Sequence, residues 1–137
     1  MLPSYFIAAG AAILLALGLV HLFYTFNGNK FDPRDAALKQ RMQEVPPVIT
    51  RETTMWRTWI GFNASHSFGA IFFGLVYTYL PLAHADMFFG SPFLIGLGLA
   101  LLAGYVVLGR VYWFSIPRRG IITATVLYVL GLVVRFA

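Results

Sequence analysis

Long stretches without charged side chains constrain this chain more than any other feature. Residues 1–29 and 120–134 carry no formal charge, and residues 58–109 carry a single one, Asp86. A helix needs about 20 apolar residues to cross the hydrocarbon core of a bilayer. These windows have room for four such helices, and we place them at residues 3–26, 55–80, 92–114 and 117–136.

The composition agrees with an integral membrane protein. Of 137 residues, 59% are apolar and 11% are charged, whereas about 25% are charged in an average soluble domain. We therefore predict an all-α protein with one integral membrane domain over residues 1–137. The absence of cysteine excludes disulfides, thiolate catalysis and cysteine-bound metals. The first window lacks a basic segment and a small-residue cleavage motif, so we expect a helix there rather than a signal peptide.

Basic residues are concentrated on one side of the predicted bundle. Nine of the ten lie in or beside the first and third connections: Lys30, Arg34, Lys39, Arg41, Arg51, Arg57, Arg110, Arg118 and Arg119. The positive-inside rule places these connections in the cytoplasm, with both termini and the loop at residues 81–90 on the outer face. Because topology explains the formal charge of +5, we do not expect nucleic-acid binding. Arg135 should reach the outer interface, in an aromatic belt that includes Tyr5, Tyr77 and Tyr79.

The connection at residues 27–54 is the only sizeable polar segment. Asp32-Pro33 is typical of an N-cap followed by proline at the first helical position. Leu38, Met42 and Val45 then share one apolar stripe, and two prolines follow. We predict a short amphipathic helix of about 13 residues at the inner membrane surface. We expect it to act as a connector, and a lid over the bundle is the alternative.

Small residues recur every four positions along three of the predicted spans. This spacing is typical of close helix packing in membranes, where lipid gives helices no hydrophobic reason to associate. The members of these stripes are Ala8, Ala12 and Ala16; Gly61, Ser65 and Gly69; and Gly96, Ala100 and Gly104. We predict that they form the packing faces of a four-helix bundle.

Polar side chains from all four spans form a predicted layer in the inner half of the membrane. Depths at about 1.5 Å per residue place His21, Asn63, Tyr105 and Thr125 at similar levels, with His66, Ser67 and Tyr128 deeper. An unsatisfied polar group is costly in hydrocarbon, so each needs a partner. Asn63, His66 and Ser67 share one stripe of their helix, apart from the stripe of Ser65.

Two interpretations of this layer stay open. In the first, His21, Asn63, Tyr105 and Thr125 satisfy one another as interhelical hydrogen bonds. In the second, a pocket exposes His66 and Asn63 to the polar head of a ligand, and His66 acts as a general acid or base. The candidate ligand-binding residues are His21, Asn63, His66, Ser67, Tyr105 and Tyr128. The sequence assigns no catalytic residue.

Haem and metal sites are not expected. A haem between His21 and His66 requires two ligands at one depth, and the depth estimate separates the two side chains by about 7 Å. A zinc site needs three or four ligands, and no carboxylate accompanies these histidines.

Three stretches, "TTMWRTWIGFNASHSFGAIFFGLVY", "GLVHLFYTF" and "FDPRDAALKQRM", resemble a family of small four-helix bacterial inner-membrane proteins without assigned activity. The resemblance covers roughly the first 80 residues and implies a bacterial inner membrane. The architecture is also similar to the sterol-isomerase-like membrane fold, whose polar residues line an intramembrane pocket. The acidic residues that such a pocket would carry are missing here, so we do not expect isomerase chemistry.

The function expected from these features is that of a non-catalytic subunit in a larger membrane assembly. Its partners would be the lipid bilayer and other membrane protein subunits, or a second copy of the chain, and it would also bind lipid. The alternative is a membrane enzyme or carrier that acts on a hydrophobic molecule around His66 and Asn63.

Overall fold

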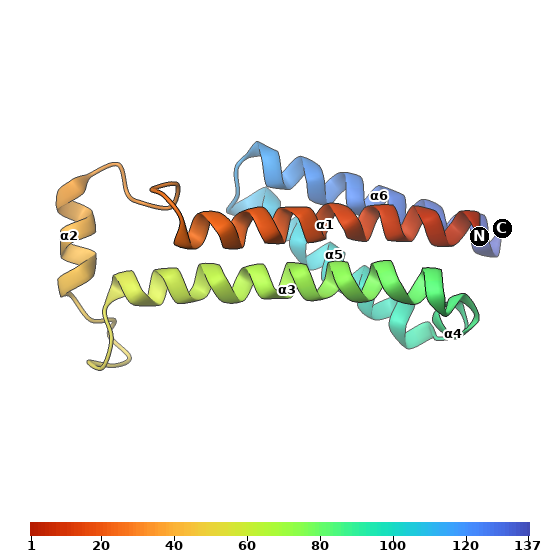
Figure 1. Cartoon of the computed structure of the whole chain (residues 1–137), viewed down its shortest axis with the longest axis horizontal. Helices are drawn as coiled ribbons and strands as arrows, with labels where there is room; N and C mark the ends of the chain where they lie inside the picture. Colours follow the sequence, from red (N-terminus) through yellow and green to blue (C-terminus); the bar gives the residue numbers. More distant parts are fainter. The chain divides into compact units, whose positions relative to one another are not determined.

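The computed structural model describes all 137 residues and contains helices but no strand. The helices are α1 (Leu2–Phe26), α2 (Ala36–Glu44), α3 (Met55–Ala83), α4 (Ala85–Phe89), α5 (Pro92–Val111) and α6 (Ser115–Phe136) (Figure 1). Four of them, α1, α3, α5 and α6, are long and apolar enough to cross a membrane. The predicted all-α architecture with a short helix between the first two spans is thus confirmed, and it is that of a multi-pass membrane protein.

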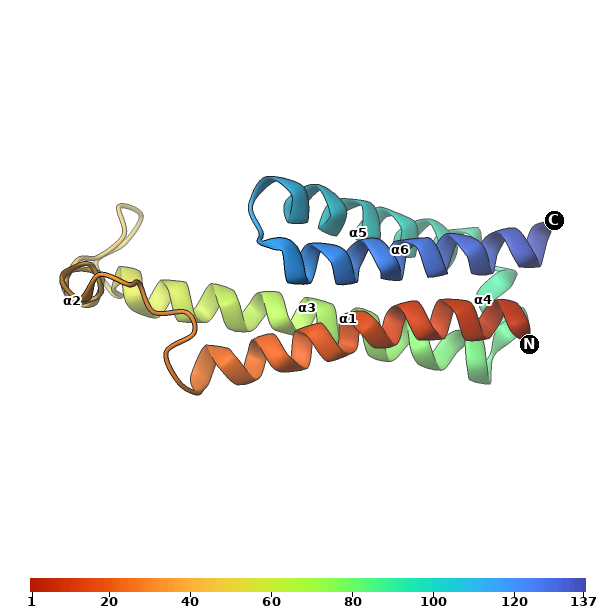
Figure 2. The same ribbon diagram turned by 90° about the horizontal axis from the view of Figure 1, so that it is seen from above.

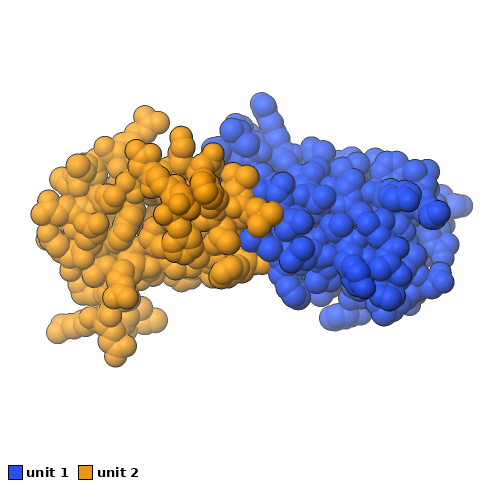
Figure 3. All heavy atoms as spheres, in the orientation of Figure 1, with its two compact units in different colours: residues 1–17, 70–137 blue, residues 18–69 orange.

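The chain divides into two compact units (Figure 3). Unit 1 consists of residues 1–17 and 70–137, and unit 2 consists of residues 18–69. The division falls within α1 and α3, so each of these helices contributes to both units. The single membrane domain expected from the sequence stays a prediction.

The ends of α3, α5 and α6 differ from the predicted ones by two or three residues. α3 continues past Pro81 to Ala83, although proline lacks the N–H that would bond to the Tyr77 carbonyl. α6 begins at Ser115 rather than Pro117, since the first N–H groups of a helix have no helical partner and a proline there costs nothing. α5 ends at Val111, three residues earlier than predicted, and Tyr112 caps it through its backbone N–H. The short helix α4 in the second loop was not predicted.

Unit 1 is assembled by glycines that let α1 approach its neighbours closely. A Cβ atom at Gly10 would lie 2.7 Å from the carbonyl oxygen of Ala124, and one at Gly131 would lie 2.7 Å from Ile7 Cγ1. These contacts join α1 to α6. A Cβ at Gly74 of α3 would meet the backbone of Leu15, which joins α3 to α1. α5 and α6 run side by side as an antiparallel pair in the same unit (Figure 2).

Two tyrosines fix α5 against the rest of unit 1. Tyr77 of α3 and Tyr128 of α6 are almost fully buried. Their hydroxyls donate to the carbonyls of Leu94, at 2.8 Å, and Ile95, at 3.1 Å, in the first turn of α5. Both rings contact Gly98, where a Cβ would lie 2.6 Å from Tyr77 Cε1. A helical side chain points toward the turn before it, so a side chain at position 98 would lie over the Leu94 carbonyl. Because residue 98 is glycine, the Tyr77 hydroxyl can reach that carbonyl. Tyr77 therefore belongs to the core of unit 1, and its depth at the outer interface stays a prediction.

The small-residue stripes predicted to assemble the bundle do not do so within the chain. A Cβ at Gly61, Gly96 or Gly104 would have no atom within 4 Å, and the remaining members of both stripes, Ser65, Gly69 and Ala100, are exposed. On α1, Ala8 is buried, whereas Ala12 and Ala16 are exposed. Spacing alone identifies a small face but not its direction, because lipid-facing positions of a membrane helix are as apolar as buried ones.

In unit 2, the helix of the polar connection is shorter than predicted. Asp35, and not Asp32, is the N-cap residue, and its carboxylate accepts from the N–H groups of Ala37 and Leu38 at 2.9 and 3.4 Å. Asp32 lies before the helix and forms an ion pair of 2.7 Å with Lys39. The proline after Asp32 consequently lies outside α2. No residue of α2 is buried in the chain.

Candidate functional site

A hydrogen bond between His21 and Asn63 joins α1 to α3 in unit 2. His21 Nε2 lies 3.1 Å from Asn63 Oδ1. The orientation of the amide is fixed by its other end, because Asn63 Nδ2 donates to the Trp59 carbonyl at 2.8 Å. The amide oxygen accepts only, so His21 must carry a proton on Nε2. This bond was one of those expected from the similar depths of the two side chains.

His66 lies one turn further along α3, and its ring also contacts His21. The ring centroids are 5.2 Å apart and the ring planes are at 79°, an edge-to-face arrangement. Residues three apart on a helix share a face, so one imidazole of α1 reaches both Asn63 and His66. The expected separation in depth between the two histidines does not keep their rings apart. We call His21, Asn63 and His66 the histidine cluster.

The polar connection places an aromatic ring against the histidine cluster. The ring of Phe31 lies 4.6 Å from that of His21, between ring centroids. Phe31 is itself held by Trp59, whose indole Nε1 donates to the Phe31 carbonyl at 3.1 Å. Phe31 was not predicted as a site residue, because its neighbours Lys30 and Asp32 are polar and mark a loop. The segment between α1 and α2 therefore contacts His21 through the Phe31 side chain and Trp59 through the Phe31 backbone.

Hydroxyl groups near the cluster bond to their own helices. Ser67 is fully buried, and its hydroxyl donates to the Asn63 carbonyl at 2.9 Å. Thr25 donates in the same way to the His21 carbonyl at 2.8 Å. Such bonds to the carbonyl four residues earlier satisfy the hydroxyl without joining two helices. Ser67 thus fills space at the helix interface, and its oxygen needs no external partner.

The other residues of the predicted polar layer lie in unit 1 and have partners there. Tyr105 packs against Trp113, with ring centroids 6.0 Å apart. Thr125 donates to the Ile121 carbonyl of its own helix at 2.8 Å. Tyr128 bonds to α5, as described above. The hydroxyl of Tyr128 thus joins two helices, whereas that of Thr125 bonds within its own helix.

Ligands for a metal ion are not grouped anywhere in the chain. No three side chains of His, Asp or Glu come together in an arrangement that could hold one. In the histidine cluster, His21 Nε2 is already engaged by Asn63. The cluster therefore resembles a hydrogen-bonded contact between helices more than a set of ligands that converge on one point.

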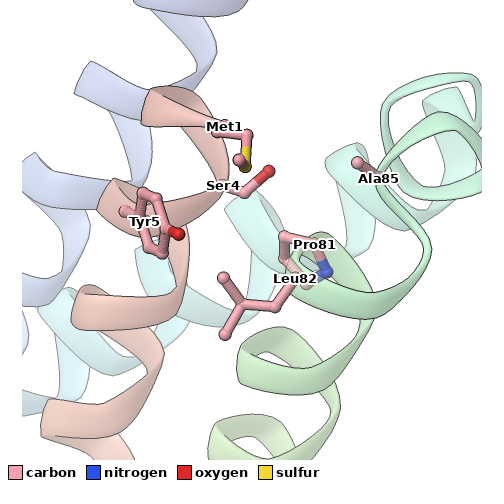
Figure 4. A pocket seen from close by; sticks show the side chains of 6 residues that line it. All are labelled: Met1, Ser4, Tyr5, Pro81, Leu82 and Ala85. Carbon is pink, nitrogen blue, oxygen red and sulfur yellow. The ribbon is translucent and has the colours of Figure 1, made fainter.

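Two cavities lie in unit 1, and neither touches the histidine cluster. The smaller one, of about 90 Å³, lies between the first turn of α1 and the end of α3 (Figure 4). The larger, of about 290 Å³, lies among α1, α4 and the end of α6. Ser4 lines both of them, and Asp86 and Arg135 line the larger one. Arg135 was expected at the outer interface, but this cavity was not predicted, because Ser4 and Asp86 are distant from Arg135 in the chain.

No protein-family model, curated protein or solved structure matches this chain. Its function therefore has to be argued from the arrangement of its own residues.

Proposed function

We propose that this chain is a non-catalytic subunit of a larger membrane assembly and contacts its partner through the outward stripe of α5. The observation that carries the proposal is the direction of this stripe. Gly96, Ala100 and Gly104 are exposed, and nothing lies within 4 Å of a Cβ at either glycine. Small residues allow two helix backbones to approach closely in a membrane. The stripe is thus open to a transmembrane helix of another protein.

The position of the stripe on α5 supports this proposal. The buried residues of α5 are Gly98, Leu102 and Gly109. At about 100° per residue, they point to the side of the helix opposite Ala100. The stripe therefore faces directly away from the contacts that α5 makes within unit 1. A similar outward stripe, Gly61, Ser65 and Gly69, exists on α3.

The hydrogen bonding of the histidine cluster also supports a non-catalytic role. His21 and Asn63 bond to each other, and the Phe31 ring packs against that of His21. A pocket for a hydrophobic substrate would ordinarily be a cavity of about 300 to 1,000 Å³, and neither of the two cavities described in unit 1 is lined by these residues. One observation favours the enzyme or carrier hypothesis: two imidazole rings, those of His21 and His66, lie in contact.

We further propose a bacterial inner membrane as the location, with the polar connection in the cytoplasm and the α4 end on the outer face. The basic residues of the connection support this orientation through the positive-inside rule. A cysteine introduced into α2, at Gln43, should be labelled by a membrane-impermeant maleimide only after the cells are opened. Labelling of intact spheroplasts would reverse the orientation.

Purification in mild detergent tests the subunit proposal. The native chain should co-purify with one membrane protein at a fixed ratio, and Gly96→Leu combined with Gly104→Leu should remove that protein. Val126→Phe is a matched control, since each substitution adds the same number of carbon atoms and Val126 is exposed on α6. A chain that remains alone and monomeric would refute the proposal, and a homodimer that G96L/G104L breaks would replace the partner by a second copy. Retention of a small molecule that is lost in His66→Ala would instead favour the enzyme or carrier.

A further inference from the structure

The larger cavity of unit 1 brings a cation and an anion together without pairing them. Arg135, in the last turn of α6, and Asp86, in α4, both line this cavity of about 290 Å³. The ion pairs of the chain are Lys39 with Asp32 and Arg41 with Glu44, so Arg135 and Asp86 are not within ion-pair distance of each other. The cavity therefore presents one positive and one negative group to whatever occupies it.

Aromatic rings hold the guanidinium of Arg135 at the wall of the cavity. Its Cζ atom lies 5.4 Å from the ring centroid of Phe89, a buried residue that also lines the cavity. It lies 5.9 Å from the centroid of Phe136. A guanidinium over an aromatic face keeps its N–H donors at the edge free for hydrogen bonds. Arg135 is thus positioned to receive an anion, and its charge is not consumed by a carboxylate.

Ser4 supplies a second donor, from a side chain that is otherwise buried. Ser4 of α1 is 5% exposed and makes no hydrogen bond within the chain. Every fully buried side-chain oxygen of the chain has a hydrogen-bond partner. The Ser4 oxygen has none, so part of its surface must be accessible. Figure 4, which draws the smaller cavity, shows the hydroxyl pointing away from α1 toward the side of Pro81 and Ala85. Ser4 and Ala85 also line the larger cavity. A nearly buried hydroxyl ordinarily has a hydrogen-bond partner, and here the partner would have to come from the cavity.

We propose that this cavity binds a zwitterion with an anionic group and a primary ammonium, as in the headgroup of phosphatidylethanolamine. The anionic group would accept from Arg135 and Ser4, and the ammonium would donate to Asp86. A cavity of about 290 Å³ is at the lower end of the range for small-molecule sites, which suits a headgroup. The carboxylate of Asp86 favours an ammonium that carries N–H groups. A choline would instead need an open aromatic face, and Arg135 already covers Phe89.

The position of the cavity along the helices agrees with a lipid headgroup. Ser4 lies in the first turn of α1 and Arg135 in the last turn of α6, and both helices are candidate membrane spans. Residues at the ends of such helices lie at the depth of the headgroups. The adjoining small cavity is lined by Tyr5 and Leu82 and offers an apolar path for the part of a lipid next to its headgroup. This inference is independent of the proposed partner contact on α5.

Native mass spectrometry of the full chain in detergent tests the site. We would titrate it with phosphatidylethanolamine, phosphatidylcholine and phosphatidylglycerol of identical acyl chains. The native chain should bind phosphatidylethanolamine about tenfold more tightly than the other two, since one charge-assisted hydrogen bond separates the best ligand from each competitor. Equal binding of all three lipids would overturn the proposal.

Substitutions identify the contacts. Arg135→Gln and Ser4→Ala should each weaken phosphatidylethanolamine binding, by about tenfold and about threefold. Asp86→Asn should remove the preference over phosphatidylglycerol. Arg119→Gln and Ser65→Ala are the controls, because Arg119 lies at the opposite end of α6 and Ser65 is exposed and bonds to its own helix. Equal losses in R135Q and R119Q would mean nonspecific attraction and would refute the site.

Two further experiments address whether the Arg135 variant folds and whether the ligand is a lipid or a free zwitterion. If Arg135→Gln does not fold, as judged by size-exclusion chromatography and circular dichroism, Arg135→Lys replaces it. Because lysine keeps the positive charge, this variant should still bind phosphatidylethanolamine, with part of the affinity lost. Soluble phosphoethanolamine should shift the melting temperature of delipidated protein little, because it lacks the apolar part. A shift as large as that from the lipid would assign the site to a free zwitterion.

Discussion

The imidazole of His21 donates through Nε2 to the amide oxygen of Asn63, at 3.1 Å, and these two residues are 42 positions apart in the chain. The direction of this bond is fixed because the NH₂ group of Asn63 donates to the Trp59 carbonyl, which leaves only the amide oxygen to face His21. One amide thus links a turn of α3 to α1 and selects the tautomer of a histidine. The contacts of Phe31 and His66 are both made with that same ring.

The His21–Asn63 bond should contribute measurably to stability. In a double-mutant cycle with His21→Ala and Asn63→Ala, we expect a coupling free energy of about 0.6 kcal/mol, the average for interhelical hydrogen bonds in membranes, and at most about 1.7 kcal/mol. Unfolding by SDS in mixed micelles measures it. Ser65→Ala is the control, since its hydroxyl bonds to the Phe62 carbonyl of its own helix. Strict additivity of the two substitutions would show that the bond is not formed.

The tautomer of His21 can be observed directly. ¹⁵N spectra of histidine-labelled protein should show a protonated Nε2 for His21, because the facing Asn63 oxygen can only accept. Asn63→Ala should change the shifts of His21 and of its ring neighbour His66. An Nε2 without a proton in the native chain would contradict the orientation of the Asn63 amide.

Two glycines of α5 should respond in opposite ways to the same substitution. Gly98→Ala places a Cβ at 2.6 Å from Tyr77 Cε1, and overpacking of this kind costs about 1 to 3 kcal/mol. Gly96→Ala meets no atom within 4 Å and should stabilise the helix by up to about 1 kcal/mol. SDS unfolding of both variants compares them. Similar effects of the two changes would mean that α5 is rotated relative to the tyrosines.

The hydroxyl of Tyr77 should matter less than the space around its ring. Tyr77→Phe removes the 2.8 Å bond to the Leu94 carbonyl but keeps the stacked contact with Phe73 at 4.4 Å. We expect a loss of about 0.5 to 1.5 kcal/mol, and a larger loss of about 3 to 5 kcal/mol for Tyr77→Ala, as for other large aromatic truncations. Tyr79→Phe, at an exposed position whose hydroxyl faces His84, should have little effect.

Asp35 and Asp32 offer a test of where α2 begins. Asp35→Ala removes the N-cap and should destabilise α2 by about 1 kcal/mol, which amide hydrogen exchange of residues 36–44 would report. Asp32→Ala breaks only the partly exposed pair with Lys39 and should change exchange by a few tenths of a kcal/mol. The reverse order would restore the N-cap predicted from the sequence.

The membrane spans were predictable because the cost of a charge in hydrocarbon leaves a long uncharged window for each of them. The direction of each face was not. Gly96 and Gly98 are two residues apart on α5, yet the first is open and the second lies beneath two tyrosine rings. Apolar periodicity separates core from water in a soluble helix, but lipid is as apolar as a core, and this signal is lost.

The histidine cluster was partly predictable and the α4 cavity was not. Depth along the helices brought His21 and Asn63 to one level, and the bond is present. The same argument could not find Phe31, since it lies in a loop, where depth is undefined. Nor could it find the cavity with Ser4 and Asp86, because the short helix α4 that shapes it gave no periodic signal.

The length of α3 has a consequence for the membrane itself. Its 29 residues rise about 43 Å, whereas the hydrocarbon core measures about 30 Å. The helix must therefore tilt or leave some of its turns uncovered. Asn63 lies in the third turn of α3, near the charged end marked by Arg57. A thicker bilayer would draw these turns inward, so the hydration of His21 and Asn63 would vary with the thickness of the membrane in which the chain resides.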